Sequence, residues 1–299
     1  MKRIPFLGRA CLLFFVIIFS FAPVSARGEG NKLQNVIHLL DYLAKDYPGA
    51  VRDGEILDIA EYTEMLEFSS RIFDIAQEIH LPSESRPAIL ADLKNLKSLV
   101  ENKSPGEKIK ELAEKAKWAI INATGYKVTP LTWPDEANGH SLYVQNCLQC
   151  HGPKGGGDGN LARDLKPAPT NFLNDSLAAR MSPFTAYNTI KLGVKGTAMP
   201  AFSHLTDKEA WDLAFYIKSL RFTKQKTDSV SLRKIFDDEY VRVSLKSVAI
   251  SSDEELINKF GHGAQAEIKL KALRTLSPSE QLAHSGLALA REYLHQAIT

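Results

Sequence analysis

Residues 146–152 read NCLQCHG, which places Cys147 and Cys150 three positions apart and His151 directly after the second thiol. Two thiols followed at once by an imidazole form the attachment signature of c-type haem. Both thiols can add across the two vinyl groups on one edge of a porphyrin, and the histidine is then held below the iron. We therefore expect one covalently bound haem c, with Cys147 and Cys150 as its anchors and His151 as an axial ligand of the haem iron.

Three other uses of a C-x-x-C pair remain as alternatives. A thioredoxin-type redox dithiol expects a strand before its first cysteine, whereas residues 139–146 predict a helix. A structural zinc site needs four ligands, and the sequence has no second C-x-x-C pair. A disulfide at this spacing would be strained.

The opposite axial ligand is predicted to be Met199, which lies between a glycine and a proline in a segment that is poorly suited to helix packing. A thioether is a soft ligand, and His/Met ligation raises the haem potential. Met65 fits a core position on a helix, and Met181 can fill a core gap in the same way. His140 and His204 are the competing ligands, and each is expected to be an ordinary surface or loop histidine.

The N-terminus has the pattern of a secretory signal peptide. Basic residues precede an uncharged apolar run of about 12 residues, which is short of the roughly 20 needed to span a bilayer. We predict a signal peptide over residues 1–26, cleaved after Ala26, and a periplasmic location. The formal net charge of +2 becomes −1 once the three positive charges of that segment are removed. This balance gives no reason to expect nucleic-acid binding.

Hydrophobic spacing predicts an all-α fold with helices on both sides of the C-x-x-C-H motif. A first helix places His38 and Asp41 opposite its apolar face. A second helix is expected from about Asp58 to His80, and a third begins at Ser104 as an N-cap. The apolar face of the first helix is Leu33, Val36, Ile37, Leu40 and Leu43, and that of the second includes Met65, Ile72, Ala76 and Ile79.

The predicted organisation after the signal peptide is a small central domain flanked by helical regions. Capping boxes at 206–209, 252–255 and 277–280 start further helices, and residues 240–245 are a weak candidate for a strand. The predicted segments are an N-terminal helical domain over 27–126, a linker over 127–136, a compact haem domain over 137–222 and a C-terminal helical region over 223–299.

Residues 137–222 resemble the small monohaem cytochrome c family with His/Met ligation. The resemblance rests on the helix before the CLQCH motif, the loop over 165–172, the loop around Met199 and the closing helix. It implies that Gly139 and Tyr143 pack against the closing helix near Tyr216. It also implies that a proline carbonyl accepts a hydrogen bond from the histidine ring, which orients such a ligand; the candidates are Pro167 and Pro169.

Two further features surround the motif. The glycines of residues 152–159 are expected to form a tight turn beside the porphyrin, because the segment lacks the ending of a phosphate-binding loop. Basic residues could ring the haem edge and steer an acidic partner, although scattered solvated charges explain them equally well. These residues are Lys154, Arg163, Lys166, Lys191 and Lys195.

Residues 36–51 and 61–68 resemble the extracytoplasmic region of bacterial iron permeases, in which a helical domain and a cytochrome c domain precede a transmembrane permease. The sequence ends at Thr299 without a transmembrane bundle, so we expect either a separately encoded exported partner of such a permease or the product of a split gene, and not the pore. The resemblance implies that ferrous iron is oxidised near the helical domain, that the haem takes the electron, and that ferric iron passes to the membrane permease.

Carboxylates of the second helix are candidate iron ligands, because hard oxygen donors suit ferric iron. Asp58, Glu61, Glu64 and Glu67 recur every three residues. The alternative is that Asp58 caps the helix with Glu61 at the third position, and that Glu64 and Glu67 belong to a solvated stripe bridged by Arg71.

The predicted function is therefore transfer of single electrons by an exported monohaem cytochrome, with a redox partner protein and a membrane iron permease as its expected partners. An alternative is a haem enzyme or small-ligand sensor in which Met199 is displaceable. A third reading is an interaction protein in which the haem is a redox accessory.

Overall fold

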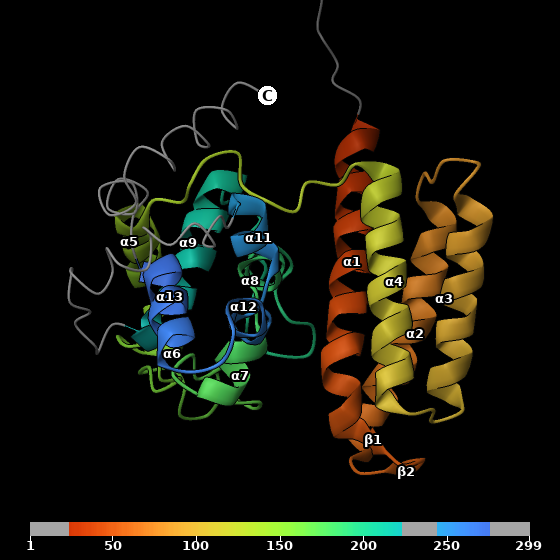
Figure 1. Ribbon diagram of the computed structural model, residues 1–299, viewed down its shortest axis with the longest axis horizontal. Coiled ribbons are helices and arrows are strands. Elements are labelled where there is room, and N and C mark those ends of the chain that lie inside the picture. Colours follow the sequence, from red (N-terminus) through yellow and green to blue (C-terminus); the bar gives the residue numbers. More distant parts are fainter. Residues whose placement is uncertain (1–23, 223–243, 276–299) are drawn as a thin grey trace, which may run out of the picture.

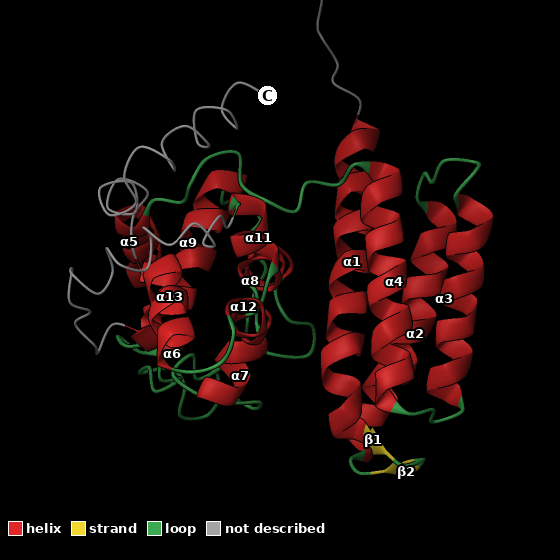
Figure 2. Cartoon of the chain, in the orientation of Figure 1, coloured by secondary structure: helices red, strands yellow, loops and turns green. Residues whose placement is uncertain are grey.

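The computed structural model describes residues 24–222 and 244–275, so most of the predicted signal peptide lies outside the described residues. Regular structure in these ranges is almost entirely helical (Figure 2), which confirms the predicted all-α class. Two groups of helices stand next to each other (Figure 1), and the chain passes from the first to the second through residues 125–135. Within the described residues, no helix combines the length and apolar character that crossing a membrane requires.

The first group is a four-helix bundle of α1 (Val24–Ala50), α2 (Ile59–Glu78), α3 (Arg86–Glu101) and α4 (Gly106–Thr124). Each helix contacts two others in a ring, in the order α1, α2, α3, α4 and back to α1. The apolar faces predicted for the first two helices are confirmed as core, apart from the partly buried Leu33. The buried members are Val36, Ile37, Leu40, Leu43, Met65, Ile72, Ala76 and Ile79.

A two-residue hairpin that the sequence analysis did not anticipate connects α1 to α2. Strands β1 (Val51–Arg52) and β2 (Glu55–Ile56) are antiparallel, with Val51 opposite Ile56. The turn residues Asp53 and Gly54 have φ values of 52° and 81°. Asp-Gly with positive φ at both central positions is the pairing that suits a tight hairpin turn.

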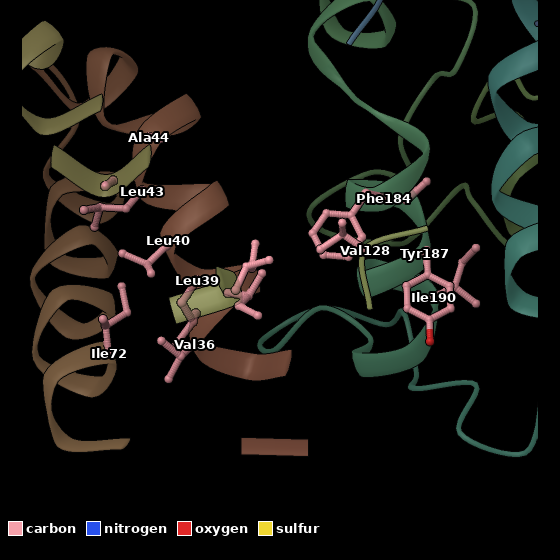
Figure 3. Close-up of a cluster of buried hydrophobic side chains, with 14 of the residues drawn as sticks. Val36, Leu39, Leu40, Leu43, Ala44, Ile72, Val128, Phe184, Tyr187 and Ile190 are labelled. Atoms are coloured by element: carbon pink, nitrogen blue, oxygen red, sulfur yellow. The ribbon is translucent and has the colours of Figure 1, made fainter. Parts of the chain in front are cut away.

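Helix α1 is buried on two sides. His38 and Asp41, which lie opposite its predicted apolar face, are therefore buried as well. These residues lie opposite the bundle core, yet they are only 6% and 3% exposed. That side of α1 packs against α8 (Pro183–Leu192) of the second group. Figure 3 shows the apolar side chains of α1 and α8 that belong to one continuous cluster. The reason is that a second domain covers the face that would otherwise meet water.

The predicted start of α4 is wrong at Ser104. Pro105 occupies the capping position, Gly106 begins the helix, and no side chain caps it. Ser104 belongs instead to the end of α3, because its N–H donates to the Leu99 carbonyl at 3.0 Å. The capping boxes at Thr206 and Ser252 are confirmed.

Two remaining helix and strand predictions concern the C-terminal region. The capping box over 277–280 and most of the candidate strand over 240–245 lie outside the described residues. Leu245 itself begins a helix, α11.

The second group surrounds the C-x-x-C-H motif. It comprises α5 (Glu136–Asn146), α6 (Leu148–His151), α7 (Asp175–Arg180), α8, α9 (Asp207–Ser219) and the 3-10 helix η1 (Leu220–Phe222). Helices α5 and α9 cross at Gly139, where an added Cβ would lie 2.3 Å from the Asp212 carbonyl oxygen. The rings of Tyr143 and Tyr216 are 5.4 Å apart. The packing implied for these residues is therefore confirmed.

The helices α11 (Leu245–Ile250), α12 (Asp253–Phe260) and α13 (Ala264–Thr275) pack on this second group. A buried carboxylate, Asp253, fixes them there. It accepts hydrogen bonds from Lys218 at 2.9 Å, from Arg221 at 3.0 Å and from Arg274 at 2.8 Å. Because Lys218 belongs to α9, this ion cluster joins the C-terminal helices to the closing helix of the central domain.

Candidate functional site

The two cysteines lie at the junction of α5 and α6. Cys147 ends α5 and its N–H donates to the Tyr143 carbonyl, while Cys150 and His151 belong to the single turn of α6. Both thiols are free. Burial raises the pKa of the Cys147 thiol to about 12, with a further contribution from Cys150. A reactive redox dithiol needs a depressed thiol pKa, so this environment argues against the thioredoxin-type alternative.

The ring of His151 is oriented by a backbone carbonyl. Its Nδ1 lies 3.0 Å from the carbonyl oxygen of Thr170, and its ring stacks on Phe172 at 4.7 Å between centroids. A bond to a carbonyl requires the proton on Nδ1, which leaves the lone pair of Nε2 available to a metal. Burial lowers the pKa of His151, and the bond to Thr170 partly opposes that effect. The imidazole is therefore neutral, as a ligand must be.

The prediction that Pro167 or Pro169 would accept this bond is wrong by one residue. The carbonyl of Pro169 faces Gly157 instead, where an added Cβ would lie only 2.5 Å from that oxygen. Gly157 has a φ of 74°, so the glycine-rich segment turns tightly behind the histidine as expected. The next carbonyl along the chain, that of Thr170, then meets the ring.

Met199 lies in the loop between α8 and α9, and backbone bonds define the position of this loop. Its N–H donates to Thr197 Oγ1 at 3.1 Å, and its carbonyl accepts from the Val194 N–H at 3.1 Å. The backbone at Met199 can pass close to Gly193 because glycine has no Cβ; an added Cβ would lie 2.9 Å from the Met199 carbonyl oxygen. The backbone on both sides of the Met199 thioether is therefore held by hydrogen bonds within the loop.

All four predicted haem residues line one cavity of about 290 Å³. An adjoining cavity of about 170 Å³ shares part of this wall. The two cavities adjoin, with His151 and Met199 in the walls of both, and they are called the larger and the smaller half of the cleft. The residues that line both halves are Tyr42, His151, Thr170, Val194 and Met199.

The chemistry of this cleft fits a covalent haem. Two free thiols lie on one side of the larger half, an imidazole is fixed by its other nitrogen, and a thioether faces the same space. Prolines and apolar side chains, among them Leu165, Pro167 and Phe202, line much of the rest of the larger half. Cys147 and Cys150 could anchor the porphyrin, and His151 and Met199 could ligate its iron.

The competing ligands are placed differently. His140 lies against Tyr216 with ring centroids 5.3 Å apart, and His204 is exposed beside Phe202. Neither is among the residues that line the two halves of the cleft. Met65 belongs to the bundle core, and Met181 lines only the smaller half. Met199 is therefore the best placed of these candidates.

Of the five basic residues that could steer an acidic partner, one is engaged within the domain. Lys191 donates to the Leu205 carbonyl at 2.8 Å and lies 3.2 Å from an oxygen of Asp207, so it is engaged within the domain. The other four members, Lys154, Arg163, Lys166 and Lys195, are exposed.

The candidate iron carboxylates lie along α2. Asp58 caps the helix, and its carboxylate accepts from the N–H groups of Ala60 at 2.8 Å and Glu61 at 3.1 Å. Glu64 and Glu67 are on the exposed stripe. Across the described ranges, no group of three or more acidic, histidine or cysteine side chains has the arrangement of a metal site.

Sequence reasoning missed the residues that α1 contributes to the cleft. Tyr42 lines both halves, and Lys45 and Asp46 line the smaller one. The signal was present as a second stripe on α1, since His38, Asp41, Tyr42 and Lys45 follow helical spacing. These polar residues looked like a solvated face because nothing in the sequence indicates that α8 packs against it.

Two protein-family models match the chain in succession. An iron permease-associated four-helix bundle domain covers residues 25–127, and a cytochrome c domain covers residues 136–221. The second match supports an electron-carrying haem protein, because a cytochrome c domain implies covalently bound haem c. In particular, the chain combines a segment that matches an iron permease-associated bundle with a following segment that matches cytochrome c.

The other comparisons add little. No curated protein matches the chain. Among solved structures, a chain of the reducing HAO-like protein complex from Kuenenia stuttgartiensis matches with 26% identity and a TM-score of 0.29. The match covers 40% of this chain and 64% of that one, so it spans less than two thirds of the solved chain.

Proposed function

We propose that this protein is an exported, periplasmic monohaem cytochrome that carries single electrons released by ferrous iron oxidation, in partnership with a membrane iron permease. Cys147 and Cys150 anchor the haem, and His151 and Met199 are its axial ligands. The observation that carries the haem part is the convergence of these four side chains on one cavity. When bound, the haem supplies reversible one-electron chemistry, and His/Met ligation favours its reduced state.

The iron part of the proposal rests on the match of residues 25–127 to an iron permease-associated bundle, and acidic side chains near the cleft are the groups that would attract the ion. Burial raises the pKa of Glu64, and the charges of Glu61, Asp46 and Glu67 raise it further. Burial also raises the pKa of Asp46; Lys45 opposes this shift, and Glu61 adds to it. Carboxylates that raise one another's pKa form a region that a cation stabilises. Of the predicted iron ligands, Glu61, Glu64 and Glu67 belong to this region, whereas Asp58 is occupied as a helix cap.

In this mechanism the bundle attracts ferrous iron and the cleft takes up its electron. Oxidation of one ferrous ion releases one electron and leaves a ferric ion, which hard carboxylate oxygens bind better. The ferric ion then passes to the permease, and a redox partner protein removes the electron from the cytochrome domain.

Two experiments test the haem part of the proposal. Extraction of the denatured protein with acidified acetone should leave the red colour on the chain; colour released into the solvent would reject the covalent haem. Addition of carbon monoxide to the reduced protein should leave its absorption spectrum unchanged. A rapid spectral shift would favour the enzyme or sensor alternative, in which Met199 is displaced.

The iron part is tested by mixing the oxidised protein with ferrous iron and following haem reduction. The double variant Glu61→Gln/Glu64→Gln should slow the reduction at least tenfold. The matched control is Asp74→Asn/Glu78→Gln, which removes two charges from the same exposed stripe farther along α2. Equal rates in the two double variants would reject a role for the carboxylates near the cleft.

A further inference from the structure

The first helix of the bundle forms part of the wall of the cleft. Tyr42 lines both halves, and Lys45 and Asp46 line the smaller half together with Arg180 of α7. These α1 residues lie outside the segment matched by the cytochrome c domain. The cleft is therefore built from both domains.

Tyr42 is held from the bundle side. Its ring meets that of His38 edge-on at 5.0 Å, and that of Phe68 of α2 edge-on at 6.1 Å. Edge-to-face contacts at these distances are favourable aromatic geometries. The ring is thus supported by two helices of the bundle while it faces the cleft.

Lys45 is fixed by the contact between the domains. Its Nζ lies 2.9 Å from Asp41 Oδ2 and 2.8 Å from Thr185 Oγ1 of α8. Thr185 also donates to Asp41, at 2.6 Å. An ammonium group has three N–H donors, so these two partners leave one donor of Lys45 for a group in the cleft.

The chemistry of haem c indicates which edge of the porphyrin each half of the cleft would hold. The porphyrin carries its two thioether links on one edge and its two propionate carboxylates on the opposite edge. Cys147 and Cys150 both line the larger half and are not among the lining residues of the smaller one. A haem anchored by these thiols would then present its propionate edge to the smaller half, whose lining includes the cations Lys45 and Arg180 and the acid Asp46.

We propose that α1 of the bundle completes the haem pocket, with Tyr42 covering the cleft and Lys45, together with Arg180, neutralising the haem propionates. This inference rests on the proposed haem site and adds a role for the bundle in binding the cofactor and setting its potential. A positive charge next to the haem favours the reduced state, because reduction adds one negative charge to the centre. Asp46 acts in the opposite direction.

The test uses the full-length protein with its haem attached and measures the midpoint potential by optical titration. Lys45→Met keeps the length of the side chain and removes its charge. At a fixed applied potential, the ratio of reduced to oxidised haem should fall about tenfold, which is ~59 mV for a one-electron couple. Asp46→Asn should shift the ratio in the other direction.

Two control variants separate the effect of the Lys45 charge on the potential from the effects of losing any lysine or of disturbing the contact between the domains. Lys32→Met removes a paired lysine from the same helix, about 20 Å away along its axis, and should leave the potential unchanged. Thr185→Val removes the hydroxyl that Lys45 and Asp41 share but changes no charge, and it should also leave the potential unchanged. If Lys45→Met matches Lys32→Met, or if Thr185→Val reproduces the whole shift, the assignment of Lys45 to the propionates is rejected.

A second measurement addresses Tyr42. The measurement is made in a Met199→Ala background, which leaves a coordination position for carbon monoxide. Replacing Tyr42 with leucine in this background should open the cleft, so that the reduced protein binds carbon monoxide at least tenfold faster than the corresponding Tyr42→Phe variant, which keeps the ring. Equal rates in both variants would reject the covering role. All of these measurements need a covalent haem, so a protein that loses its colour in the extraction test refutes the proposed function itself. Unchanged potentials in a coloured protein refute only the part assigned to α1.

Discussion

Acidification should destabilise this protein through His38, which is buried where α1 meets the second domain. The side chain is 6% exposed, and its Nδ1 has no hydrogen-bond partner among the described residues. Burial lowers the pKa of His38 from 6.5 to about 4; Asp41 opposes this shift and Lys45 adds to it. The folded protein therefore keeps this imidazole neutral at a pH at which the unfolded chain protonates it.

The sign and size of the effect follow from proton linkage. Between pH 6.5 and 4 the unfolded chain binds a proton that the folded protein does not, so the free energy of unfolding falls as the pH is lowered. At about 1.4 kcal/mol per pKa unit, the displacement of His38 corresponds to a loss of about 3 kcal/mol over that window. Well above pH 6.5 His38 contributes no slope, because it is neutral in both states.

Urea denaturation followed by circular dichroism, repeated at several pH values between 7.5 and about 4, would measure this loss. Acidic residues also titrate in this range, so the informative quantity is the difference between the wild type and His38→Gln. The variant should lack the additional fall of about 3 kcal/mol. His262→Gln, which changes an exposed histidine, should behave like the wild type. Parallel curves for the wild type and His38→Gln would show that the burial argument is wrong.

Three further outcomes are expected. Met199→Ala should lower the midpoint potential and let the reduced protein bind carbon monoxide; an unchanged spectrum with carbon monoxide would point to another ligand. Gly139→Leu should separate α5 from α9 and cost about 1–3 kcal/mol or more, seen as a lower melting temperature, and an unchanged melting temperature would contradict the close crossing. Asp253→Asn leaves Lys218 and two arginines without their buried counter-charge, so it should cost about 3–5 kcal/mol in urea denaturation, whereas Glu254→Gln on the same helix should be nearly neutral.

The four proposed haem residues, which line one cavity, could be picked out from the sequence because their chemistry is local. A C-x-x-C-H motif needs only one turn of helix, and Met199 stands out because methionine is rare in this chain. The bundle core could be predicted for the same reason, since Met65 and Ile72 follow helical spacing on one face. In these cases the pattern lies within a single element.

Features that depend on tertiary contacts could not be predicted. The identity of the carbonyl that orients His151 depends on how the proline-rich loop crosses Gly157, and the carbonyls of Pro169 and Thr170 are equivalent in the sequence. The burial of His38 and Asp41 depends on α8, which is far away along the chain. A polar stripe has the same spacing whether water or another domain covers it.

The contact between Gln34 of α1 and Asn188 of α8, at 3.1 Å in a buried setting, bears on how this protein can be dissected. Excising the cytochrome segment would expose the apolar surface of α8 and leave Asn188 without that partner. It would also remove Asp41. Burial alone would raise the pKa of this carboxylate, but Lys45 and Lys117 hold the pKa well below its usual range. A truncated fragment would therefore expose a surface that the intact chain keeps dry. Electrochemical values measured on such a fragment would describe a different molecule.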